Sequence, residues 1–177
     1  MIIRPATPDD AHAVAAVRVA SWRATYRGVV PDSYLDAMTP EESRDGWRAV
    51  AAGEIAGAEL LVCDIGGAVV GFACYGAARP PELGYGGELY ATYYLPEAMG
   101  KGYGTQTVAQ VVRGLVRMGH TDMILWVMEA NARGRRFYDG IGGAAVPGAR
   151  QSFEIDGVAI WEIAYGFRPL PDLSARG

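Results

Sequence analysis

The sequence predicts one α/β domain, in which a mixed and mostly antiparallel sheet carries helices on both faces. The first observation is the hydrophobic spacing, which changes along the chain between the period of helices and the period of strands. The second is the order of these segments: a strand, helices, three antiparallel strands, a helix, a strand, a helix and a hairpin. The third is the length of 177 residues, half of them apolar, which suits one domain with a full core. We expect residues 1–168 to form the domain and residues 169–177 to form a C-terminal tail.

The N-terminal part predicts a short edge strand and three helices. Residues 2–4 suit the strand, and Thr7-Pro8-Asp9-Asp10 suits a helix start with a threonine cap, a proline in the first turn and early acids. Apolar residues at helical spacing continue this helix to Gly28. Pro31 and Pro40 then begin two shorter helices.

The middle of the chain predicts an antiparallel hairpin and a third long strand. Residues 60–65 and 68–75 alternate around Gly66-Gly67, which is typical of a tight hairpin turn. Residues 77–84 form a loop, and residues 87–95 suit a strand that Pro96 ends.

The C-terminal part predicts a helix, a strand, a helix and a second hairpin. Apolar residues at helical spacing end near Gly119, and residues 123–127 suit a strand buried on both faces. Asn131 can cap a helix that stops at Gly140. The hairpin joins residues 152–155 to residues 158–165 through an Asp-Gly turn.

Composition excludes several classes of protein. The net charge of −4 argues against a nucleic-acid-binding surface. No apolar run approaches the roughly 20 residues of a membrane span, and the N-terminus lacks the apolar core of a secretory signal, so we expect a cytoplasmic protein. Cys63 and Cys74 are expected to be buried thiols, and neither they nor the two histidines have the spacing of a metal site.

The segment Met99-Gly100-Lys101-Gly102-Tyr103-Gly104-Thr105 predicts a phosphate-binding loop. Its glycines free the backbone to turn tightly and leave the N–H groups open, and a helix follows directly. A helix N-terminus adds unpaired N–H donors and partial positive charge. The spelling matches neither a P-loop, because Gly102 follows Lys101, nor a dinucleotide-binding fingerprint, because the third glycine is missing.

The chain resembles the GCN5-related N-acetyltransferase family in three motifs that occur in the family's order. The strand and glycine loop from Glu88 to Thr105 are similar to the family's acetyl-CoA-binding core. Residues 131–143, with Asn131, the Phe-Tyr pair and the glycine stop, are similar to its next helix, and residues 4–10 to its first strand and helix. The family loop is usually written Arg/Gln-x-x-Gly-x-Gly/Ala. Gly102 and Gly104 match it, whereas Met99 replaces Arg or Gln, so we expect a weaker phosphate contact.

The resemblance implies direct transfer of an acetyl group from acetyl-CoA to an amine, with no metal. It implies that Tyr94 and Leu95 hold the acetyl and pantetheine arm, that residues 99–105 hold the pyrophosphate, and that Asn131 bonds the pantetheine arm. It implies that Tyr138 protonates the CoA sulfur and that Glu88 deprotonates the amine through water. The residues themselves leave simpler readings open: Tyr138 as core packing, Asn131 as a helix cap, Glu88 and Lys101 facing solvent.

The acceptor is expected between the first two helices, the loop before the central strand and the final hairpin. Trp22, Tyr26 and Tyr34 are candidate lining residues, with Tyr75, Tyr90 and Trp126 behind them, although such aromatics often only pack. We expect a small-molecule amine as acceptor. A protein N-terminus or lysine stays an alternative, and so does an inactive acyl-CoA sensor, because of Met99. Relatives are often dimers, but no interface can be assigned from the sequence.

Overall fold

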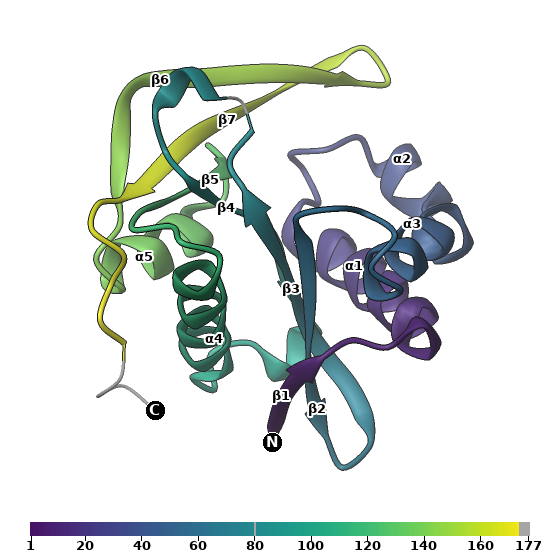
Figure 1. The fold of residues 1–177 in the computed structure, drawn as a ribbon. Coiled ribbons are helices and arrows are strands. Elements are labelled where there is room, and N and C mark those ends of the chain that lie inside the picture. Colours follow the sequence, from purple (N-terminus) through teal and green to yellow (C-terminus); the bar gives the residue numbers. More distant parts are fainter. Residues whose placement is uncertain (80, 174–177) are drawn as a thin grey trace.

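A seven-stranded sheet separates two layers of helices in the computed structural model, which describes residues 1–79 and 81–173 (Figure 1). The order across the sheet is β1-β2-β3-β4-β5-β7-β6. The strands are β1 (Ile2–Pro5), β2 (Ala58–Ile65), β3 (Ala68–Ala77), β4 (Gly87–Tyr94), β5 (Met123–Met128), β6 (Ala144–Ile155) and β7 (Val158–Phe167). The helices are α1 (Ala11–Thr25), α2 (Asp32–Ala37), α3 (Glu41–Ala51), α4 (Tyr103–Arg117) and α5 (Ala132–Gly140). Three short 3-10 turns are η1 (Pro8–Asp10), η2 (Pro81–Leu83) and η3 (Pro96–Ala98). The predicted fold class is confirmed.

Apolar side chains of β2 and β3 alternate between the two faces of the sheet and so contribute to the core on each face. Leu61 and Tyr75 point into a core shared with α4 and α5, whereas Val62 and Phe72 point into a second core shared with α1 and α3. Successive strand residues face opposite sides of the sheet, so one hairpin supplies both cores. Cys63 and Cys74 are free and buried, as predicted.

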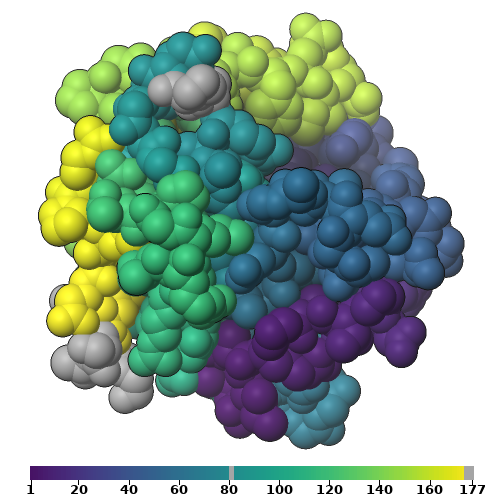
Figure 2. All heavy atoms as spheres, viewed as in Figure 1, coloured from purple at the N-terminus to yellow at the C-terminus, as the bar shows by residue number. Residues whose placement is uncertain are grey.

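The β6–β7 hairpin extends beyond the rest of the sheet and lies above α2 (Figure 2). Its turn residue Asp156 accepts a hydrogen bond from the Ser33 hydroxyl of α2 at 3.4 Å. Ile155 and Ile160 pack in one cluster with Trp22 of α1. The hairpin is therefore held against the helices that precede the central strands.

Several element boundaries differ from the prediction. The first helix ends at Thr25, before the expected Gly28, and the largest difference is at β6. The strand β6 begins at Ala144, eight residues before the expected start. The sequence pattern missed these residues because most residues of β6 are exposed and show no apolar alternation. Its register against β7 also shifts between Ala145 and Arg150. The first helix begins as a 3-10 turn, in which the Asp10 carboxylate accepts the Thr7 N–H at 2.7 Å.

The described part of the predicted tail lies against the domain. The Leu170 N–H donates to the Thr121 carbonyl at 2.9 Å, and Leu173 is 5% exposed in the core beside α4. Residues 174–177 of the predicted tail lie outside the described residues. The boundary at residue 168 stays a prediction.

Candidate active site

The strands β4 and β5 pair in parallel over only two residue pairs and then separate. The pairs are Gly87 with Met123 and Glu88 with Ile124. Beyond them, β4 continues to Tyr94 and β5 to Met128 without a shared ladder. Backbone N–H and C=O groups along a separated strand can bind an extended ligand as another strand would.

A cavity of about 470 Å³ lies at this separation. Its walls come from α1, β4, β5, β7, the loop before α4 and the start of α5. Its lining residues include Trp22, Tyr26, Tyr94, Met99, Gly100, Gly102, Gly104, Thr105, Trp126, Asn131, Arg133, Arg136, Tyr138 and Glu162. The cavity therefore brings together residues that are distant in the sequence.

The glycine loop forms one end of the cavity in the conformation that its composition predicts. Gly100 and Gly102 have φ values of 78° and 82°, which favour glycine. Gly102 is the N-cap of α4 and has no side-chain oxygen to satisfy the first N–H groups of the helix. Those donors and the helix dipole suit an anionic group, so the loop fits a phosphate-bearing ligand.

Two arginines at this end were not predicted from the sequence. Arg133 and Arg136 of α5 line the cavity. A Cβ atom on Gly100 would lie 3.4 Å from an Arg133 guanidinium nitrogen, which shows how near this cation comes to the loop. Their spacing of three residues on a helix after Asn131 is the signal that could have identified them.

The side chain of Asn131 forms hydrogen bonds both to α5 and to Tyr26 at the other end of the cavity. Its side-chain oxygen accepts the Gly134 N–H at 2.8 Å and caps α5, so the cap reading is correct. Its amide nitrogen donates to the Tyr26 hydroxyl at 3.3 Å. One amide hydrogen is left for a ligand, because an amide nitrogen has two.

Tyr138 is 8% exposed and lies in the cavity wall, with its ring against Phe137 and Tyr165. Burial is the main cause that raises its pKa, and Tyr93 and Tyr94 raise it further. The phenol is therefore protonated at neutral pH and able to donate.

Tyr94 connects the end of β4 to α4. Its hydroxyl forms a hydrogen bond with the Thr107 hydroxyl at 2.5 Å and lies 3.3 Å from the Tyr103 carbonyl, a second acceptor for its one proton. A Cβ on Gly71 would overlap the Tyr94 ring at 2.2 Å, so only glycine at that position admits the ring. These contacts fix the start of α4 relative to the separated strand.

Glu88 does not line the cavity, although it lies on the central strand. It is 5% exposed, and its carboxylate accepts the Arg79 N–H at 2.6 Å and lies 3.7 Å from the Arg79 guanidinium. Burial raises its pKa, and these contacts lower it. The solvent-facing reading was wrong, and a role for Glu88 as general base stays a prediction.

The other end of the cavity is aromatic and holds one carboxylate. Trp22 and Tyr26 are 8% and 5% exposed, with ring centroids 5.1 Å apart, and Trp126 of β5 lines the same end. Tyr34 packs beside Trp22 at 6.4 Å but is not a lining residue. Glu162 of β7 lines this end and was not predicted, because a single strand glutamate carries no sequence signal.

Three of the predicted cofactor residues lie outside the cavity wall. They are Leu95, the exposed Lys101 and Tyr103, of which the last offers its carbonyl to Tyr94. In residues 1–79 and 81–173, no three His, Cys, Asp or Glu side chains are grouped to hold a metal. No helix in the described ranges is long and apolar enough to cross a membrane.

Comparison with known proteins agrees with this geometry. The model of the FR47-like protein family matches residues 81–151. The chain is 36% identical over 173 residues to "Uncharacterized N-acetyltransferase YuaI" of Bacillus subtilis (strain 168), which covers 98% of this chain and 94% of that protein.

Solved structures of low sequence identity share the fold. The PaiA N-acetyltransferase from Thermoplasma acidophilum in complex with coenzyme A has a TM-score of 0.69 at 18% identity, over 92% of this chain and 96% of that one. The ribosomal-protein-alanine N-acetyltransferase from Brucella melitensis has a TM-score of 0.71 at 21% identity, over 95% and 99% of the two chains.

Three findings define the class of this protein: its fold, the cavity where β4 and β5 separate, and a relative that matches almost the whole chain. The chain belongs to the GCN5-related N-acetyltransferase family, whose co-substrate is acetyl-CoA.

Proposed function

We propose that this protein transfers the acetyl group of acetyl-CoA directly to a primary amine of a small molecule, with Tyr138 as the general acid. The observation that carries the proposal is one cavity, lined by both the glycine loop and Tyr138, where β4 and β5 separate. A ligand with its phosphates at the loop and its arm between the strands would bring its thioester to the middle of this cavity.

Each step of the transfer has a candidate group. The amine nitrogen attacks the thioester carbonyl, the C–S bond breaks, and the electron pair leaves with sulfur, which takes the Tyr138 proton. This phenol can supply that proton because burial raises its pKa above the ordinary value of ~10, so it is protonated at neutral pH when the thiolate leaves. Holding both reactants in one cavity also removes part of the entropic barrier.

The walls of the acceptor end support a small molecule. Buried aromatic rings from α1 line this end, and the β6–β7 hairpin packs against α1 and α2 beside it.

A peptide acceptor is the second candidate. Phe153 and Val158, on one face of the β6–β7 hairpin, are 37% and 44% exposed and offer apolar surface to a chain that passes along it. The Brucella neighbour is named for acting on a ribosomal protein, but an identity of 21% supports only the fold.

The test is release of CoA thiol from acetyl-CoA across a panel of small amines and a panel of peptides with free N-termini or lysines. We expect release with at least one small amine and little with peptides. Calorimetry with CoA runs in parallel. Binding of CoA without release from any amine would indicate an acyl-CoA sensor and contradict the proposal.

A further inference from the structure

Glu162 is the carboxylate at the acceptor end of the cavity. It lies on β7, opposite Met128 of β5 on one side and Gln151 of β6 on the other. It is half-buried, and it lines the cavity together with Trp22, Tyr26 and Trp126. A charged group in such a wall needs a partner, because burial of a lone charge is unfavourable.

Three other carboxylates on or next to β4 and β5 have cationic partners within the protein. Glu129 lies 2.7 Å from Arg150, Asp122 lies 2.8 Å from Arg168, and Glu88 lies 3.7 Å from Arg79. Within the described part of the chain, no ion pair involves Glu162, which accepts one hydrogen bond, from the Gln151 amide at 3.2 Å. A cation that enters the cavity is the natural partner for this carboxylate.

The surroundings of Glu162 favour an organic cation. The charge of Glu162 acts on Tyr26, just after the C-terminal end of α1, and on Tyr93 of β4. The Arg18 cation of α1 also acts on Tyr93 and lies over the Trp22 ring at 4.9 Å, but it forms no ion pair with Glu162 within the described residues. Gln151 faces it from β6 and Met128 from β5, and neither is charged. Rings beside a carboxylate form a site for an ammonium group, because the ring faces also attract cations.

We propose that Glu162 binds the acceptor as an ammonium ion and removes its proton, so that the acceptor is an alkylamine that is charged in solution. This inference rests on the proposed function. An ammonium nitrogen has no lone pair and cannot attack the thioester. Transfer of one proton to the Glu162 carboxylate leaves a neutral amine, and Glu162 later releases that proton to water.

The remaining protons balance within the cavity. The neutral amine forms the C–N bond, the C–S bond breaks, and Tyr138 protonates the departing sulfur. The second amine proton leaves the new amide nitrogen and restores Tyr138. The products are an N-alkylacetamide, CoA thiol and one proton in water.

The titration of Glu162 is consistent with a base. Burial raises its pKa above the ordinary value, and the bond from Gln151 lowers it. A carboxyl with a raised pKa takes a proton more readily at neutral pH than an ordinary glutamate does. Glu88 shares the raised pKa, but it lies outside the cavity wall and already accepts the Arg79 N–H.

The experiment compares two kinds of acceptor in the wild type and in Glu162→Gln. Alkylamines such as phenethylamine and cadaverine are charged at pH 7, whereas arylamines such as p-anisidine are largely neutral and need no base before attack. We expect Glu162→Gln to lower kcat/KM for alkylamines by about 10²- to 10⁴-fold, the usual range for general-base catalysis, and to lower it far less for arylamines. The acidic limb of the alkylamine pH profile should disappear, and CoA affinity by calorimetry should not change.

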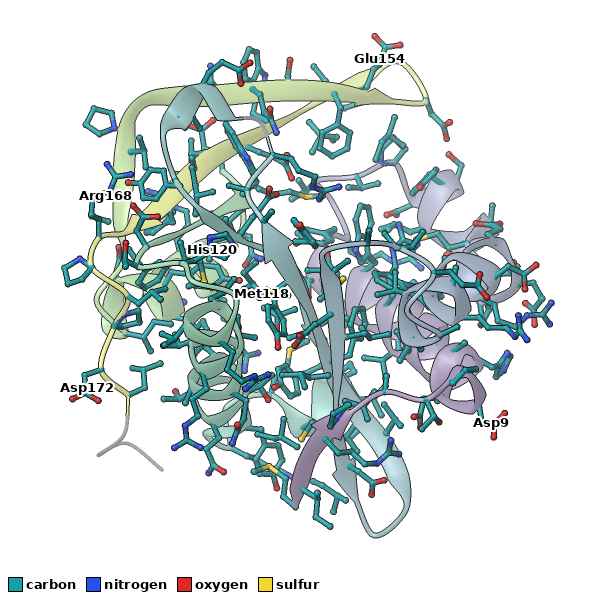
Figure 3. The ribbon with its side chains drawn as sticks, viewed as in Figure 1. Asp9, Met118, His120, Glu154, Arg168 and Asp172 are labelled. Atoms are coloured by element: carbon teal, nitrogen blue, oxygen red, sulfur yellow. The ribbon has the colours of Figure 1, made fainter. Side chains whose placement is uncertain are left out.

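Two further variants control for charge and for the alternative base. Glu154→Gln removes a carboxylate from the exposed end of the same hairpin (Figure 3) and should leave every parameter unchanged. Glu88→Gln tests the base that the family resemblance implies: we expect its acidic limb to remain, because the carboxylate is outside the cavity, and loss of that limb in Glu88→Gln instead of Glu162→Gln would overturn the role of Glu162. Glu162→Gln should fold at pH 7, because it removes a half-buried charge that has no cationic partner.

The outcomes separate this inference from the proposed function. Wild-type protein that releases no thiol with any amine overturns both. Active wild type with an unchanged rate and pH profile in Glu162→Gln overturns the role of Glu162 alone. Equal losses for alkylamines and arylamines would make Glu162 a positioning residue and overturn its role as the base.

Discussion

The two ends of the cavity are built in different ways. The phosphate end is built around one continuous segment, the glycine loop at the start of α4, with two arginines of α5 beside it, and it offers backbone N–H groups and positive charge. The acceptor end is assembled from α1, β5 and β7, and it offers aromatic rings and one carboxylate. The first suits the co-substrate acetyl-CoA, and the second can vary without any change to the first.

The largest effect is expected at Tyr138, which lies between the two ends. Tyr138→Phe keeps the ring and its packing against Phe137 but removes the proton donor. We expect kcat to fall by about 10²- to 10⁴-fold, while calorimetry gives nearly the same affinity for CoA. A variant with wild-type turnover would require another acid.

The glycine loop provides the next largest effect. Gly102→Ala puts a side chain at a φ of 82°, which costs an L-residue about 1–2 kcal/mol and moves the N–H groups that face the phosphates. We expect the Kd for CoA to rise about tenfold. Gly119→Ala, at a φ of 87° just beyond the other end of α4, carries a similar strain far from the loop and should lower only the melting temperature. Equal Kd changes in both variants would remove the loop from the binding site.

A smaller effect is expected from the cations of α5. Arg133→Met removes the guanidinium beside Gly100, at a solvent-exposed site where salt weakens charge interactions. We expect the KM for acetyl-CoA to rise about threefold to tenfold at low salt and less at high salt. Arg113→Met on the exposed side of α4 is the control, and its KM should stay at the wild-type value.

The smallest effects are expected at Asn131, where two substitutions separate its two roles. Asn131→Ser keeps an oxygen that can cap α5 but removes the amide donor, so KM for acetyl-CoA should rise a few-fold without loss of stability. Asn131→Ala also removes the cap, which costs about 1 kcal/mol and lowers the melting temperature by roughly 2–4 °C. An unchanged KM in both would restrict Asn131 to capping.

The difference between the two ends of the cavity also explains which features could be predicted from the sequence. The glycine loop, the cap at Asn131 and the order of elements depend on residues close together in the chain, and each has a local pattern. Glu162 and Trp22 line the same cavity only because β7 pairs with β5 and α1 covers the same face of the sheet. The residues next to each of them in the sequence form no pattern that predicts its role. Glu88 combines both situations. Its strand was predicted from the local pattern, but its contact with Arg79, nine residues away in the sequence, was not.

The short ladder between β4 and β5 affects how rigidly the two halves of the sheet are held together. One continuous ladder joins β1 to β4 and another joins β5, β7 and β6, and two residue pairs connect them. In the proposed function the pantetheine arm lies where the missing ladder would be, so the co-substrate completes the backbone pairing of the sheet. The hairpin that carries Glu162 belongs to one half and the start of the glycine loop to the other. Arrival of acetyl-CoA would therefore stiffen the frame that aligns the two reactants, and departure of CoA would loosen it.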